Sequence, residues 1–255
     1  DVSCSSPEAE TMRRQLVSWD GNMDAARREP TVYQAFMRRL AEHALRPLCG
    51  DAWGLAAGFD LRHPLFGYPG NLIGRVTPAL LERWAAGDDG ILDGQGSWPE
   101  IAARALEDAV RDLHVSHGGR RRWRWGRVHR LRLEHPLAVR RVLRPLLNAR
   151  AITVGGDTDT VMATGALPGP DFSTRVMAPS WRQVMDVGNW NEGCFGIHYP
   201  GQSGHRASRH HHDLSRRWRD NRMLRLGWGD AAFSGRRVLR LQPRERGLIA
   251  AEPPL

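Results

Sequence analysis

The 255-residue chain contains no lysine, so all 37 of its cationic side chains are arginines. It has only three cysteines, which lie far apart without CxxC spacing and so argue against a disulfide framework or a zinc knuckle. No stretch approaches the roughly 20 consecutive apolar residues that span a bilayer, and we expect no membrane segment. The chain starts at Asp1 without a signal-peptide pattern, so we interpret it as processed or as part of a longer protein.

The net charge of +9 would ordinarily suggest an anionic partner. Nucleic-acid-binding proteins normally combine arginine with lysine, and a complete lack of lysine is more typical of a GC-rich coding bias. The overall charge is therefore weak evidence for a nucleic-acid partner. An apolar content of 41% and a charged content of 25% are typical of a globular protein.

The first half of the chain carries four apolar patterns at helical spacing. Thr77 and Pro78 are typical of a helix start, and Ser97 with Glu100 forms the capping-box pattern. Residues 47–74 are rich in glycine, proline and aspartate, so we expect irregular structure there. The predicted helices cover Glu10–Gly21, Thr31–Leu45, Thr77–Gly87 and Ser97–Leu113.

The second half changes character at residues 117–119 and shows short strand patterns. The predicted strands lie within His129–Leu137, Ala151–Ala166, Arg182–Gly188 and Gly193–Gly201, and a helix is predicted over His212–Arg222. Helices followed by mostly antiparallel strands indicate an α+β fold. We expect a helical region over 1–116, a strand-rich region over 117–228 and a tail over 229–255.

Ser203 lies in the sequence Gly201-Gln202-Ser203-Gly204-His205. The nucleophile elbow of α/β-hydrolases requires G-x-S-x-G between a strand and a helix, and the last glycine is missing here. Pro200, directly upstream, suits a turn. We therefore predict a structural turn rather than a Ser-His catalytic triad.

Three consecutive histidines, His210 to His212, precede Asp213. Two imidazoles that bind one metal from a helix need i, i+4 spacing, and consecutive residues point in different directions. We predict a helix entry instead, with Ser208 as the N-cap and Asp213 in the first turn. A weak surface metal site is the alternative interpretation.

Arginine alternates with tryptophan between Gly119 and Arg130. Such a pattern could stack single-stranded bases. In a strand, however, Trp123 and Trp125 would share a buried face while Arg122 and Arg124 faced solvent. We favour the buried aromatic face over a nucleic-acid-binding module.

The segment Gly155 to Val161 reads GGDTDTV. Its glycines permit a turn with positive φ. Asp157 and Asp159 could bind a cation or orient a catalytic group, and a turn stabilised by Asx hydrogen bonds explains them equally well. The residues alone leave these alternatives open.

Taken together and in order, the motifs of this chain resemble the C-terminal part of the β chain of penicillin acylases (penicillin amidases), a family of N-terminal-nucleophile (Ntn) hydrolases. Each motif alone is weak evidence for the family, whereas the occurrence of all of them in the same order is specific. One departure is Ser208-Arg209-His210-His211, where the family usually shows S-P-H-Y. The motifs are LVSWDG (16–21), VYQAFMRRL (32–40), WGRVHRLRLEHPL (125–137), GGDTDTV (155–161), SWRQVMDVG (180–188), PGQSG (200–204) and SRHHHD (208–213) leading to Trp218.

The resemblance implies the C-terminal segment of an αββα Ntn-hydrolase sandwich. It further implies a self-cleaving precursor and a serine at the N-terminus of the β chain, which attacks a linear N-acyl amide through an acyl-enzyme. The α-amino group of that serine, with a pKa near 8, would be the base. The nucleophile, the oxyanion-stabilising asparagine and the calcium ligands of the family lie upstream, so we assign no catalytic residue and no cofactor to this chain.

Asp159 is the residue that aligns with a family position near the active site, with Asp157 as its less certain neighbour. The resemblance implies that both support the catalytic groups or maturation without touching substrate. The implied partners are the α chain and the N-terminal part of the β chain of the same precursor, and a small N-acyl amide such as a β-lactam antibiotic or an acyl-homoserine lactone; no nucleic acid and no membrane are expected. The parent protein would be bacterial and periplasmic or secreted, this segment alone would be inactive, and a degenerate paralogue without activity is the alternative.

Overall fold

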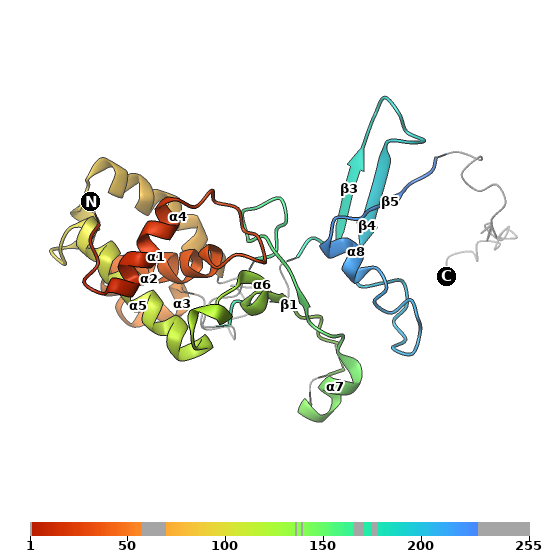
Figure 1. Cartoon of the computed structure of the whole chain (residues 1–255), viewed down its shortest axis with the longest axis horizontal. Helices are drawn as coiled ribbons and strands as arrows, with labels where there is room; N and C mark the ends of the chain where they lie inside the picture. Colours follow the sequence, from red (N-terminus) through yellow and green to blue (C-terminus); the bar gives the residue numbers. More distant parts are fainter. Residues whose placement is uncertain are drawn as a thin grey trace, which may run out of the picture.

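The computed structural model describes residues 2–57, 70–135, 137–138, 140–165, 171–174 and 178–228. Four long helices dominate the first half, and short strands follow (Figure 1). The helices are α1 (Pro7–Val17), α2 (Glu29–Cys49), α3 (Trp53–Ala56), α4 (Gly70–Ala86), α5 (Trp98–His117), α6 (Trp125–Val128), α7 (Arg144–Leu147) and α8 (Ser215–Arg219). The strands are β1 (Arg130–Leu131), β2 (Ile152–Thr153), β3 (Trp181–Met185), β4 (Cys194–His198) and β5 (Leu224–Arg225).

Local sequence signals explain where two of the long helices begin. The Ser6 hydroxyl accepts the Ala9 N–H at 3.4 Å before α1, whose first residue is Pro7. At α5, the Glu100 carboxylate accepts the Ser97 backbone N–H at 2.8 Å, as the predicted capping box requires. Such caps satisfy backbone donors that a helix leaves free at its N-terminus.

The prediction of a helix start at Thr77 is wrong, because α4 already begins at Gly70. In the sequence, apolar residues at 72, 73 and 76 continue the helical spacing upstream, and an internal proline removes only one backbone donor. The expectation of irregular structure over 47–74 is also wrong in part. Helix α2 extends to Cys49, and α3 lies within that range.

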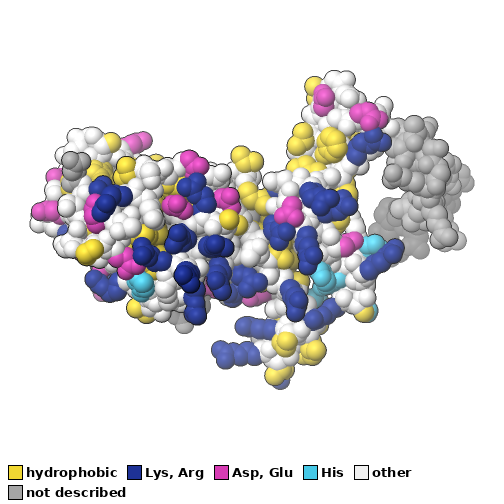
Figure 2. All heavy atoms as spheres, in the orientation of Figure 1, with side chains coloured by type: hydrophobic (Ala, Val, Ile, Leu, Met, Phe, Trp, Pro, Cys, Tyr) yellow, Lys and Arg dark blue, Asp and Glu magenta, His cyan; other side chains and the backbone are white. Residues whose placement is uncertain are grey.

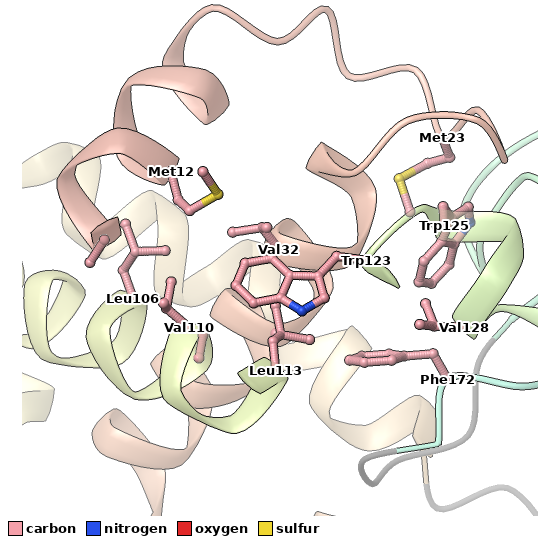
Figure 3. Close-up of a cluster of buried hydrophobic side chains, with 13 residues drawn as sticks. Met12, Met23, Val32, Leu106, Val110, Leu113, Trp123, Trp125, Val128 and Phe172 are labelled. Carbon is pink, nitrogen blue, oxygen red and sulfur yellow. The ribbon is translucent and has the colours of Figure 1, made fainter. Parts of the chain in front are cut away.

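Two apolar clusters fill the helical half. The first lies among α1, α2 and α5 and includes the buried indoles of Trp123 and Trp125 and the ring of Phe172 (Figure 3). The second lies among α2, α4 and α5 around Trp98. Each large, fully buried side chain contributes on the order of 2–3 kcal/mol of hydrophobic free energy. The first cluster also joins the two halves, because Trp123, Trp125 and Phe172 of the second half pack in it.

The strands pair antiparallel in two separate sheets. β1 pairs with β2, and β3, β4 and β5 form a three-stranded sheet in that order. Trp218 is fully buried beneath the larger sheet, where the Arg182 guanidinium lies 4.5 Å from its ring. The architecture confirms the α+β class, and β3 and β4 confirm two of the predicted strands.

Three predictions for the second half are wrong. The strand expected over His129–Leu137 is reduced to the two residues of β1. Trp123 and Trp125 lie in a turn and a short helix rather than in a strand, although both are fully buried. Helix α8 begins at Ser215, and the Ser208 hydroxyl instead accepts the His210 N–H, so Asp213 precedes the helix.

The transition predicted at 117 coincides with the end of α5, and the division into three regions stays a prediction. The proposed tail lies outside the described residues. Among the helices that the structure describes, none is long and apolar enough to cross a bilayer.

Candidate functional site: the Gly-Gly-Asp turn

The Gly155-Gly156-Asp157 turn is fixed against a loop that follows α1. The Gly156 N–H donates to the Met23 carbonyl at 2.9 Å, and the Gly156 carbonyl accepts the Trp125 indole N–H at 2.8 Å. Gly156 has φ +82°, a conformation that favours glycine. The turn therefore bridges the loop after the Trp19-Asp20-Gly21 motif and the short helix α6.

Two glycines allow the backbones to approach closely here. An ideal Cβ on Gly155 would lie 2.9 Å from the Met23 carbonyl oxygen, and one on Gly126 would lie 2.8 Å from the Ala25 Cβ. The Gly126 N–H also donates to the Ala25 carbonyl at 2.8 Å. The loop at residues 23–25 is thus packed between α6 and the turn.

Two threonines hold the rest of the turn. The Asp157 N–H donates to the Thr160 hydroxyl at 2.9 Å, and the Thr164 hydroxyl donates to the Gly155 carbonyl at 2.6 Å. An isolated bridge joins Asp157 to Ala163. Of the two strands expected around this turn, β2 is the one found in the described residues up to 165, and beyond the turn side-chain hydrogen bonds and the isolated bridge stand where the second strand was predicted.

Asp157 points toward α2, where the Gln34 side-chain amide donates to its carboxylate. The pKa of Asp157 is raised to about 6, chiefly by burial and also by the negative charge of Asp159, while hydrogen bonds from Thr158 oppose the rise. Burial and the charges of both aspartates also raise the pKa of Tyr33. Asp159 itself is exposed.

This arrangement places a half-buried carboxyl group beside an amide donor and close to a phenol. A carboxyl group that titrates near neutral pH can hold or release a proton, and it can orient its donors. In the described ranges, no three histidine, cysteine or acidic residues are grouped to hold a metal ion. Orientation by hydrogen bonding is therefore the chemistry that the site supports best.

His129 lies behind the turn and was not singled out by the sequence. Its ring stacks on Trp125 with 4.2 Å between centroids, and its Nδ1 lies 2.6 Å from the Phe172 carbonyl oxygen. Burial lowers the pKa of His129 to about 4, against the opposing effect of backbone carbonyls at Phe172 and Thr164. The imidazole is consequently neutral at physiological pH and donates from Nδ1.

Ser203 has no triad geometry. Its hydroxyl accepts the His205 backbone N–H at 3.1 Å, and its carbonyl faces the His211 Nδ1 at 3.1 Å. Its N–H donates to the His210 carbonyl at 3.1 Å. No imidazole of the described residues hydrogen-bonds the hydroxyl, in agreement with the predicted structural turn.

The three histidines diverge. His210 pairs with Asp213 at 2.8 Å on the surface, while buried His211 is directed at the Ser203 carbonyl. The rings of His211 and His212 are inclined by 85°. They form no common metal site within the part of the chain that the structure describes.

The sequence matches the penicillin amidase family over residues 2–234, and the chain belongs to that family. It is also 35% identical over 221 residues to the penicillin acylase 2 proenzyme of Pseudomonas sp. (strain SE83). That alignment covers 85% of this chain and 26% of the relative, so the chain spans about a quarter of the relative's length. The family places the α+β architecture in the context of an Ntn hydrolase.

The site residues Tyr33, Gln34 and His129 were missed by sequence reasoning. Gln34 and Asp157 are separated by 123 positions, and no local pattern predicts that α2 and the turn meet. The roles assigned to Asp157 and Asp159 by resemblance stay predictions.

Proposed function

We propose that this chain is the C-terminal part of a penicillin-acylase-like amidohydrolase that hydrolyses linear N-acyl amides. The observation that carries the proposal is the family match over residues 2–234. The relative's description as a proenzyme supports a precursor that is processed into chains. The acyl-enzyme would form on an N-terminal serine outside this chain.

Within that enzyme, the described residues would provide support rather than the nucleophile. We assign Asp157 the role of a positioning residue, because its carboxylate joins α2 to a turn that also contacts the loop at Met23. The negative charge of Asp159 would help to raise the pKa of Asp157 and the pKa of Tyr33. Neither side chain is assigned contact with substrate.

The test is expression of the gene together with its upstream coding sequence. We expect cleavage into two chains, a serine at the new N-terminus and hydrolysis of chromogenic N-acyl anilides. Replacement of that serine by alanine should abolish hydrolysis, and the present chain alone should be inactive. A correctly processed protein that hydrolyses no member of an acyl-chain panel would favour a degenerate paralogue.

Asp157→Asn in the same precursor tests the positioning role. We expect slower maturation or a lower kcat, with KM little changed, because the variant removes the ionisable carboxyl group at the contact between α2 and the turn, and Asp157 is assigned no contact with substrate. Asp51→Asn is the matched control, since Asp51 is exposed and lies elsewhere. Equal maturation rates and equal kcat values for the two variants would show that Asp157 has no positioning role.

Nucleic-acid binding is not supported as a second function. Trp123 and Trp125, the aromatic residues that would stack on bases, are each 0% exposed. Base stacking requires an accessible ring face.

A further inference from the structure

The positive charge of the chain is concentrated in one segment. Residues 120–150, here called the arginine segment, contain 11 of the 37 arginines and one of the 28 acidic residues. The other 224 residues contain 26 arginines and 27 acidic residues and carry a net charge of −1. A coding bias explains why arginine replaces lysine, and it does not explain this local imbalance.

Among the described residues, most arginines of the arginine segment have no carboxylate at ion-pair distance. Outside it, arginines pair repeatedly with nearby acids, as Arg13 does with Glu10 at 2.8 Å and Arg39 with Asp112 at 2.6 Å. Within it, ion pairs are formed by Arg120 with Glu8 and by Arg132 with Asp171. The following nine are exposed and form no ion pair with a described residue: Arg121, Arg122, Arg124, Arg127, Arg130, Arg140, Arg141, Arg144 and Arg150.

The first part of the arginine segment is held rigidly. The Trp123 indole donates to the Gly118 carbonyl at 2.8 Å and the Trp125 indole to Gly156, and both rings are buried in the helical core. Arg122 and Arg124 alternate with these anchors and face solvent. Their backbone is thus fixed before any partner binds, which lowers the entropic cost of association.

The second part adds exposed aliphatic side chains to the charge. Val142 is 73% exposed and Leu146 is 62% exposed, and both lie among the unpaired arginines. Helix α7 stands away from the helical bundle, and dark-blue side chains gather along the lower edge of the molecule toward it (Figures 1 and 2). Arginine beside exposed apolar groups is typical of protein interfaces.

The chemistry of the partner follows from these features. Single-stranded nucleic acid is disfavoured, because both tryptophans are buried. A bilayer is disfavoured, because α7 has four residues and presents no extended amphipathic face. The rest of the chain, with a net charge of −1, leaves most of the positive charge of the segment unbalanced.

We propose that the arginine segment docks on an acidic surface of the remaining part of the same precursor. This rests on the proposed function, since the relative is a proenzyme of which the chain covers 26%. Carboxylates of the partner would pair with the exposed guanidiniums, and its apolar side chains would cover Val142 and Leu146. Such complementarity also fixes register between chains.

Site-directed photo-cross-linking in the full precursor is the first test. Benzoylphenylalanine replaces Val142, and the same probe at Val17, which is 75% exposed on α1, is the control. We expect a cross-link from position 142 into an acidic part of the upstream sequence, read by mass spectrometry, and none from position 17 into that part. A cross-link to a second copy, to lipid or to nucleic acid, or no cross-link, would overturn the proposal.

Charge reversal is the second test. Arg140→Glu, Arg141→Glu and Arg144→Glu together should lower recovery of the associated chains about tenfold, because like charges across an interface are strongly unfavourable. The matched control reverses Arg28, Arg209 and Arg217, which are exposed and lie outside the segment. Equal recovery of the two triple variants argues against docking; if the first fails to fold, the uncharged photo-probe decides.

Acylase activity is measured in the same preparations. A cross-link without activity would support the docking and reject the proposed function. Activity without the cross-link would reject the docking alone.

Discussion

The helical half and the strand-bearing half of the molecule bury their apolar side chains to different degrees. In the described residues, the two clusters packed on the long helices comprise 13 and 9 buried apolar residues, although Trp123, Trp125, Val128 and Phe172 of the first lie beyond residue 117, whereas the cluster around Trp218 comprises four. Large side chains stay exposed on the sheet and its hairpin, including Trp181 at 47% and Val184 at 54%. Helices satisfy their own backbones and can close a core together, whereas a three-stranded sheet by itself leaves faces and edges uncovered.

The largest effect is expected for a substitution within the first apolar cluster, which packs on the long helices. Trp125→Ala should lower the free energy of unfolding by about 3–5 kcal/mol, because it removes a fully buried ring and the hydrogen bond to Gly156. Trp190→Ala, at a 45% exposed position near the hairpin tip, should cost less than about 1 kcal/mol. Urea denaturation followed by circular dichroism measures both free energies of unfolding. Equal losses would contradict the difference in burial between the two regions.

Gly156→Ala tests the junction between the two halves. We expect a loss of about 2–4 kcal/mol, because the residue has positive φ and its new Cβ would overlap the Met162 carbonyl oxygen. Gly94→Ala is the matched control, since Gly94 also has positive φ but has open space around the Cβ position. Gly94→Ala should cost about 1 kcal/mol. A similar cost for Gly156→Ala would show that the turn can accommodate a Cβ atom at position 156.

The pH dependence of stability tests the Asp157 contact. Because the pKa of Asp157 is raised to about 6 in the folded state, its contribution is present when the carboxyl is protonated, and stability falls as pH rises from about 4 to 6. Asp157→Asn cannot ionise, so above pH 6 it should gain up to about 3 kcal/mol relative to the native chain.

The comparison with Asp157→Asn also cancels the effect of His129. The lowered pKa of His129 makes stability fall as pH drops from about 6.5 to 4, the opposite slope in nearly the same range. Both proteins share that slope, so the difference between their urea-denaturation curves reports Asp157 alone. A difference that stays constant from pH 4 to 6.5 would mean that the carboxyl is not buried.

The smallest effect on stability is expected for substitutions of the exposed side chains of β3. Val184→Ser and Trp181→Ser should each change the unfolding free energy of the chain by about 0.5 kcal/mol or less, as at other exposed positions. They should nevertheless reduce aggregation of the chain expressed alone, which we predict to be poorly soluble. Light scattering measures this, and a wild-type chain that is monomeric at high concentration would contradict it.

The sequence predicted elements whose signals are local. The Ser97 and Glu100 capping pattern places α5, and the short runs Arg182–Gly188 and Gly193–Gly201 predict β3 and β4, because caps and short strand patterns act within a few residues. The burial of Trp123 was predicted while its strand was wrong, because both a strand and a short helical turn can bury that ring.

The interior of the candidate site could not be predicted in the same way. Asp157 was identified through the GGDTDTV motif, but its donor Gln34 comes from α2 and is brought to it only by tertiary packing. The pKa values of Asp157 and His129 depend on burial, which a linear pattern does not reveal. Thr77 was misplaced as a helix start because a Thr-Pro pair also fits the interior of α4.

The tight approach of residues 23–25 to Gly126 and Gly155 has a consequence for how such proteins diverge. Any enlargement at Ala25 would have to be matched by a shift of two segments about 100 and 130 positions downstream, so these three stretches should vary together among homologues. Insertions should accumulate elsewhere, and a sequence that lengthens only one of the three would have lost this junction.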